Sequence, residues 1–152
     1  MDKELHRIVS TCIVYKDNKY LLLQRSFEKK VFPGKWTVPG GGLTVDDYIN
    51  LPKTTSDHWY FALENSLRRE IKEETGIEAG KISYLCDMTF IRPDNIPVIV
   101  LSFYAPYKSG EIKLDSESIN HAWVTFDEVK NYDLIEGIAD EIKMVNDLIS
   151  QI

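Results

Sequence analysis

Three glutamates lie close together in the segment LRREIKEETGI. Glu70, Glu73 and Glu74 alternate there with basic residues, among them Arg69. Clustered carboxylate oxygens suit a hard divalent cation such as Mg²⁺, which also keeps water ligands that a phosphate can replace. The same letters also fit the solvated face of a surface helix, on which Arg69 and Glu73 form an i,i+4 ion pair. The two interpretations place the glutamates on different faces of the helix.

The helical periodicity separates the glutamates from the basic face. At about 100° per residue, Tyr60, Leu63, Leu67 and Ile71 form one apolar stripe, and the three glutamates continue that stripe or its edge. Carboxylates grouped at the C-terminal end of a helix repel one another and are disfavoured by the helix dipole. Partial burial adds to the cost. Because a bound divalent cation would remove this penalty, the placement favours a metal site.

A helix over about 57–75 is expected to position these carboxylates. Ser56 or Asp57 can cap its N-terminus. Gly76 suits the left-handed conformation that follows a last helical turn, and Ile77 can fold back as the accompanying apolar contact. The helix therefore has start and stop signals at both ends.

Strand-like segments lie before and after this helix, and an amphipathic helix over 138–149 closes the chain. Strands before and after one internal helix, with a terminal helix, predict an α+β or α/β layered sheet. The expected strands are 8–15, its hairpin partner 20–25, a short strand at 36 that runs into the glycine-rich turn of WTVPGGG, and segments 81–92, 97–105 and 121–126.

Length and composition are those of one globular domain over residues 1–152, with 43% hydrophobic and 28% charged residues. The net charge of −6 disfavours non-specific nucleic-acid binding but allows an anionic substrate, because a bound cation can invert the local field. Cys12 and Cys86 lie in apolar runs, so they are expected to be core residues without a disulfide. There is no signal-peptide pattern and no apolar run near the ~18 residues of a membrane span, so we expect a cytoplasmic protein without membrane partners.

The glutamate segment and its neighbours resemble the Nudix hydrolase signature G-x5-E-x7-R-E-U-x-E-E-x-G-U, in which U is aliphatic. LLLQR, FPGKWTVPGGG and AWVTFDEV also occur in the expected order. The resemblance implies an α/β fold, the Nudix α/β/α sandwich with a mixed β-sheet between helices. The right half of the signature matches in full at Arg69, Glu70, Ile71, Glu73, Glu74, Gly76 and Ile77.

The left half of the signature departs from the family pattern. The family has fourteen positions from the glycine to the arginine, whereas Gly41 and Arg69 are twenty-eight apart. We therefore expect an insertion of about fourteen residues, at about 43–58, that forms a flap near the site. Counting back from Arg69 places Phe61 at the first glutamate. That carboxylate is either lost or supplied by another residue, for which the candidates are Asp46, Asp47 and Asp57.

The resemblance implies a Mg²⁺- or Mn²⁺-dependent hydrolase of a nucleoside diphosphate linked to another group X. Glu70 or another of the carboxylates would orient the attacking water, with Glu73 also catalytic. Arg69 would hold the glutamates through charge-assisted hydrogen bonds. The implied metal ligands are the carbonyl of Gly40 and the carboxylates of Glu70, Glu73, Glu74 and Glu117.

Further residues are implied to contact the substrate. Arg25 matches a family arginine at the phosphates or nucleoside, although it could equally pair with Glu28. Glu117 could also be an ordinary polar loop residue. The implied substrate-binding residues are Arg25, Gly41, Phe90 and Arg92.

The leading substrate expectation is a nucleoside or deoxynucleoside triphosphate, cleaved to a monophosphate and pyrophosphate. The segment YDLIEG lacks the asparagine that mutator members place before the last helix, which argues against strict specificity for 8-oxo-dGTP. ADP-ribose, or another nucleotide sugar or dinucleotide, is the alternative, because Pro93 lies sixteen residues after Ile77. A non-catalytic nucleotide-binding module and a homodimer are also left open.

Overall fold

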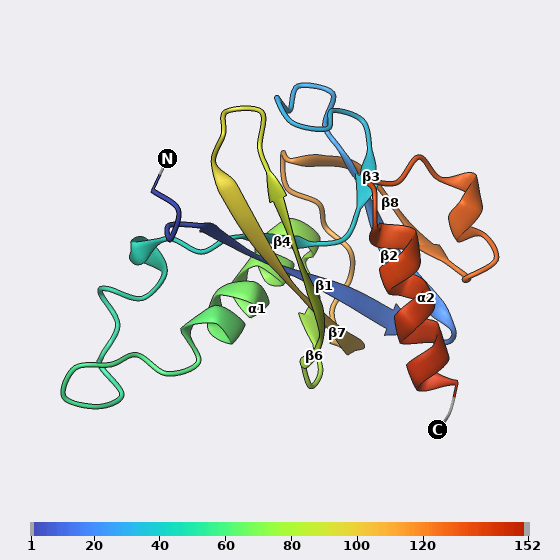
Figure 1. Ribbon diagram of the computed structural model, residues 1–152. Helices are drawn as coiled ribbons and strands as arrows, with labels where there is room; N and C mark the ends of the chain where they lie inside the picture. Colours follow the sequence, from blue (N-terminus) through green and yellow to red (C-terminus); the bar gives the residue numbers. More distant parts are fainter. Residues whose placement is uncertain (1, 151–152) are drawn as a thin grey trace.

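The computed structural model describes residues 2–150, which form a mixed eight-stranded sheet and two α-helices (Figure 1). Two short 3-10 helices, η1 (Val45–Asp47) and η2 (Val129–Asn131), lie in connections. The α-helices are α1 (Ala62–Thr75) and α2 (Ile138–Ile149). The strands are β1 (Arg7–Lys16), β2 (Lys19–Arg25), β3 (Trp36–Thr37), β4 (Gly40–Gly42), β5 (Glu78–Ala79), β6 (Ser83–Ile91), β7 (Pro97–Ser109) and β8 (Ser118–Val124).

β1 is the central strand of this sheet. It pairs in parallel with β7 and antiparallel with both β2 and β4. The β1–β2 hairpin turns at Asp17 and Asn18, whose φ angles of 52° and 63° fit the tight turn predicted for KDNK. β6 extends the sheet antiparallel to β7, and β8 extends it antiparallel to β2. The predicted mixed sheet is therefore confirmed.

Each face of the sheet packs against one helix. On one face, Leu67 and Ile71 of α1 join a cluster with Cys12 and other apolar residues of β1 and β2. On the other face, Ile142 of α2 packs with Ile13. Successive residues of β1 thus face opposite helices, as the twofold periodicity of a strand requires. This arrangement is the expected α/β/α sandwich.

The predicted start of α1 is wrong. The helix begins at Ala62, and Phe61 before it has a left-handed φ of 63° without a side-chain cap, so neither Ser56 nor Asp57 caps it. Tyr60 lies outside the helix and is exposed rather than part of the buried stripe. The preceding residues fold on themselves instead, because Trp59 stacks on Tyr48 and donates its indole N–H to a backbone carbonyl in the same segment.

The predicted end of α1 is confirmed. Gly76 has a φ of 79°, and its N–H donates to the carbonyl of Lys72 at 2.9 Å. Ile77 is fully buried against the same core cluster as the helix. The sequence could predict this end of the helix because the left-handed turn and its apolar contact involve only neighbouring residues.

The three glycines of β4 form a strand rather than the predicted turn. Gly40 pairs with Thr11, and an added Cβ at Gly40 would lie 2.2 Å from the carbonyl oxygen of Ser10. Only glycine permits this approach of the two backbones. Of the two cysteines, Cys12 is buried and Cys86 is half-buried, and both are free thiols. In residues 2–150, no helix is long and apolar enough to cross a membrane.

Candidate metal-binding carboxylate site

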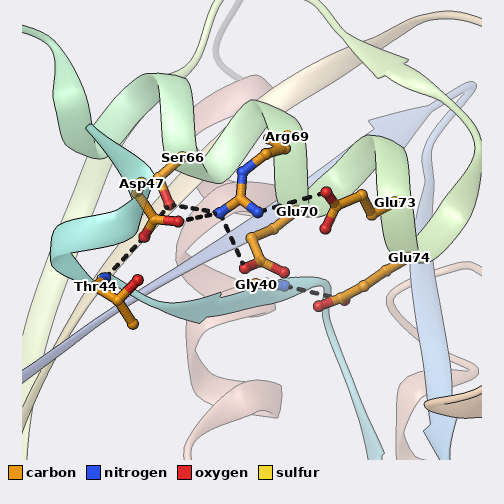
Figure 2. Close-up of polar contacts among 8 residues, drawn as sticks. All are labelled: Gly40, Thr44, Asp47, Ser66, Arg69, Glu70, Glu73 and Glu74. Atoms are coloured by element: carbon orange, nitrogen blue, oxygen red, sulfur yellow. Dashed lines mark hydrogen bonds and ion pairs between the residues drawn. The ribbon is translucent and has the colours of Figure 1, made fainter. Parts of the chain in front are cut away.

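The C-terminal half of α1 lies beside β4 and brings two glutamates onto its glycines (Figure 2). The N–H of Gly40 donates to Oε2 of Glu74 at 3.3 Å. The carboxyl of Glu70 lies over Gly41, where an added Cβ would be 2.7 Å from its Cδ atom. Glu74 is only 9% exposed. Two of the three glutamates therefore do continue the buried face of the helix, and the missing side chains of β4 make the space for them.

Burial makes both carboxylates reluctant to ionise. Desolvation raises the pKa of Glu74 to about 9, although the Gly40 hydrogen bond opposes the shift. The charges of Glu70, Asp115 and Glu117 raise it further. Desolvation also raises the pKa of Glu70, which the neighbouring Arg69 partly opposes. A pair of partly buried carboxyls with raised pKa values is an environment that a bound cation would relieve.

Arg69 connects the glutamates to the segment before the helix. Its Nη2 donates to Oδ1 of Asp47 at 2.6 Å and lies 3.5 Å from Oε1 of Glu70. Its Nη1 donates to Glu73 at 3.4 Å. Figure 2 shows this guanidinium between the three carboxylates. Arg69 thus contacts Glu70 and Glu73 but not Glu74, and the implied role of holding the glutamates stays a prediction.

Asp47 is the aspartate that reaches Arg69. Its side chain is 9% exposed and accepts hydrogen bonds from the N–H of Thr44 at 2.8 Å and the hydroxyl of Ser66 at 3.3 Å. η1 therefore fixes Asp47 against α1 before the chain leaves the site. Asp57, a second candidate, instead pairs with Lys53 at 3.6 Å.

Asp47 is one of three aspartates that could replace the first glutamate of the signature, and its spacing distinguishes it from the other two. Asp47 follows Gly41 with five residues between them, which is the G-x5-E spacing of the Nudix signature. The count back from Arg69 gives Phe61 instead, whose side chain is exposed just before α1. The forward count selects the residue that the structure places against Arg69.

The other two predicted acidic ligands lie at the edge of the site. Glu73 is exposed and contacts Arg69. Glu117 forms an ion pair with Lys29 at 3.1 Å, although its charge still acts on Glu74. In the described part of the chain, no three acidic, histidine or cysteine side chains converge closely enough to hold a metal ion. Only Glu70 and Glu74 are brought together here.

Of the four predicted substrate contacts, Gly41 lies beneath the carboxyl of Glu70, whereas the other three form no ion pair or hydrogen bond with the glutamates in residues 2–150. Nε of Arg25 donates to the carbonyl of Val31 at 3.0 Å, rather than pairing with a surface acid. Phe90 is half-exposed near the end of β6. Arg92 follows that strand and pairs with Asp94 at 2.7 Å in the β6–β7 turn. The structure brings none of these three into contact with the glutamates.

The chemistry of the donors fits a hard divalent cation. Glu70 and Glu74 offer carboxylate oxygens, and Glu74 has no ion-pair partner within 4 Å among residues 2–150. Mg²⁺ is commonly held by one or two carboxylates together with waters and substrate phosphates. These residues would hold such an ion beside the glycines of β4.

Comparison with known proteins supports one family. A family model described as the NUDIX domain matches residues 5–145. The chain is 29% identical over 139 residues to the nucleoside triphosphatase NudI of Escherichia coli strain K12, covering 84% of this chain and 88% of that protein.

Solved structures share the fold. The MutT protein from Methanosarcina mazei Go1 superimposes with a TM-score of 0.72 at 22% identity, covering all of both chains. The NUDIX domain of Shewanella oneidensis NrtR, solved with ADP ribose, gives a TM-score of 0.71 at 19% identity and covers 98% of this chain and 90% of that one. The same sandwich thus occurs in proteins whose names differ in function.

Proposed function

This chain belongs to the NUDIX family and is a Nudix hydrolase, and from that premise we propose that it is a Mg²⁺- or Mn²⁺-dependent nucleoside triphosphate pyrophosphohydrolase. The products would be a nucleoside monophosphate and pyrophosphate. The observation that carries the proposal is the pair Glu70 and Glu74 against β4, where Arg69 contacts Glu70 and the N–H of Gly40 donates to Glu74. The likeness to a nucleoside triphosphatase over 84% of the chain supports the substrate class.

The residues of this chain would divide the work between binding and orientation. Glu70 and Glu74, with the carbonyl of Gly40, would hold the cation, and Glu73 and Glu117 would complete its surroundings. When bound, the cation would offset phosphate charge and lower the pKa of water. Glu70, whose carboxyl lies beside Gly41, would accept a proton from the attacking water. Arg69 would hold the carboxylates that it contacts in position beside the backbone of β4.

We infer that Asp47 takes the place of the first glutamate of the signature. The interruption then comprises residues 48–61, between Asp47 and the first residue of α1. Without those fourteen residues, Asp47 would stand eight positions before Arg69, which is the family spacing E-x7-R. The insertion would therefore leave the contact between Asp47 and Arg69 intact.

A second candidate is hydrolysis of ADP-ribose or another nucleoside diphosphate derivative. It rests on Pro93, which lies in the β6–β7 turn at the spacing found in ADP-ribose hydrolases. A third is nucleotide binding without catalysis. The retained Glu70, Glu73 and Glu74 favour an enzyme over that module.

The experiment that separates these candidates is a hydrolysis panel with Mg²⁺ or Mn²⁺ and identified products. It would include nucleoside and deoxynucleoside triphosphates, 8-oxo-dGTP, ADP-ribose, NADH, dinucleoside polyphosphates and nucleotide sugars. Release of pyrophosphate from triphosphates, faster than cleavage of the other classes, supports the proposal. Preferential cleavage of ADP-ribose would replace it with the second candidate, and binding without turnover of any compound would favour the third.

A further inference from the structure

One arginine differs from the others in having no acceptor. Within residues 2–150, Arg7 donates no hydrogen bond to the protein and lies within 4 Å of no carboxylate. The other four are bound: Arg25 to the carbonyl of Val31, Arg68 to Glu64 and the carbonyl of Ala79, Arg69 to Asp47, and Arg92 to Asp94. Arg7 is an exposed residue, so its guanidinium is accessible to a ligand.

The guanidinium of Arg7 lies over Gly42, the last residue of β4. An added Cβ at Gly42 would be 2.4 Å from Nη2 and 2.8 Å from Cζ of Arg7. At the neighbouring Gly41, the same construction meets the carboxyl of Glu70 instead. Successive residues of a strand point to opposite faces. The two glycines of β4 therefore leave space for an acid on one face and a base on the other.

We propose that the guanidinium of Arg7 binds a phosphate group of the substrate at the edge of β4. The inference rests on the proposed function and deepens it by naming a positively charged side chain that would bind the phosphate chain. Arginine presents a planar fork of donors that matches phosphate oxygens in pairs. Arg69 differs from Arg7 in that its guanidinium already donates to Asp47 and Glu73.

The position of Arg7 suits a group that lies against the carboxylates. β4 pairs with β1 alone among the described strands, and the carboxyl of Glu70 and the guanidinium of Arg7 flank it at the neighbouring Gly41 and Gly42. One strand therefore separates Arg7 from Glu70. A phosphate chain that runs along this edge could be held by Arg7 at one group while a neighbouring phosphate faces the carboxylates.

Binding of a non-hydrolysable triphosphate, the α,β-methylene analogue, in the presence of Mg²⁺ tests the inference. Arg7→Ala should raise its Kd by about 10-fold or more, since a charged hydrogen bond to a phosphate is lost. The KM for the hydrolysed triphosphate should rise in parallel, while kcat stays within about threefold. Arg7→Lys should restore part of the affinity. Lys16→Ala, which removes the same charge from the other end of β1, should leave the Kd within about twofold.

Gly42→Ala provides a second and independent variant. Its Cβ should displace the guanidinium and reproduce the loss seen in Arg7→Ala. In the double variant the two losses should not add, because they remove one interaction. Circular dichroism would verify that all variants are folded.

Two results would overturn the inference on its own while the proposed function stands. In one, the wild-type protein binds and cleaves triphosphates, and Arg7→Ala does both as well as Lys16→Ala. In the other, the losses from Arg7→Ala and Gly42→Ala add fully. A folded wild-type protein that neither binds the analogue nor cleaves triphosphates would overturn the proposed function together with this inference.

Discussion

At the scale of single residues, Glu74 carries the largest conflict between stability and function. It is a carboxyl buried against a backbone N–H, with further carboxyls around it and no ion-pair partner within 4 Å in residues 2–150. Such a group lowers the stability of the metal-free fold whenever it ionises. A protein that keeps it is expected to use its charge, and a divalent cation is the partner that the surrounding oxygens suit.

The raised pKa of Glu74 gives a pH dependence of known sign. Its ordinary pKa of 4.5 rises to about 9 in the folded state, so between these values the folded protein binds more protons than the unfolded chain. Stability of the metal-free protein should therefore fall as the pH rises from 5 to 9. Glu74→Gln should remove much of this slope and raise the free energy of unfolding at pH 8 by roughly 2–4 kcal/mol. Urea unfolding in EDTA across this range measures both. An unchanged slope in the variant would show that Glu74 ionises normally.

Asp47 offers a test of how the site is anchored. Asp47→Ala removes the 2.6 Å contact to Arg69 and should lower kcat/KM by about 10- to 100-fold, the usual effect of losing a group that orients a metal ligand. Asp46→Ala removes the same charge from the same short helix without touching Arg69, and should retain activity within about threefold. Equal losses in both variants would mean that the charge of η1, rather than the contact, is what matters.

At the scale of elements, the site depends on how closely α1 approaches β4. Gly41→Ala should push the carboxyl of Glu70 away, because the new Cβ would lie 2.7 Å from Cδ. We expect at least a 10²-fold loss in kcat with little change in the thermal midpoint. In a Glu70→Ala background the same change should cost nothing further, since the clashing group is gone. A normal kcat in Gly41→Ala would contradict the placement of Glu70.

The elements also show which features the sequence could predict. The end of α1 was predictable because Gly76 and Ile77 act locally, and the buried stripe of Leu67 and Ile71 follows from the helical period. The start of α1 was not, since nothing in the sequence reveals that Trp59 and Tyr48 stack and hold the preceding segment out of the helix. Apolar periodicity extended the helix into residues that pack on one another instead.

The two halves of the signature predicted the candidate site to different degrees. The signature placed Glu70, Glu74 and Arg69 at one end of one helix. The i,i+4 spacing also predicted the pair of Arg69 with Glu73, whereas only the structure shows that Glu117 pairs with Lys29 from a loop distant in sequence. The forward spacing from Gly41 distinguishes Asp47 among the three candidates, and the structure adds its contact with Arg69.

At the scale of the whole molecule, residues 48–61 form the connection between η1 and α1. This segment lies beside α1 and extends away from the sheet (Figure 1). Contacts within this segment include the packing of the Tyr48 ring against the Trp59 ring and the ion pair of Lys53 with Asp57. Large apolar side chains are exposed along it, among them Phe61 at 72%.

Removal of residues 48–61 should therefore leave a folded protein. The deletion joins Asp47 to Ala62 and places Asp47 where it can cap α1, while its distance in sequence to Arg69 becomes that of the family. We expect metal-dependent hydrolysis within about tenfold of the intact chain, and a changed KM if the segment contacts the substrate. Size-exclusion chromatography and circular dichroism would control for folding. A folded but inactive deletion variant would show that the segment supplies a catalytic group.

The most direct test of the central claim is triphosphate hydrolysis with product identification, in Mg²⁺ and in EDTA, by the wild-type protein and by Glu74→Gln. The carboxylate site predicts a monophosphate and pyrophosphate from the wild-type protein in Mg²⁺ only. The variant, although at least as stable as the wild type without metal, should be slower by 10²-fold or more. Equal turnover by the folded variant, or turnover that persists in EDTA, would contradict the assignment of these glutamates as the catalytic metal site.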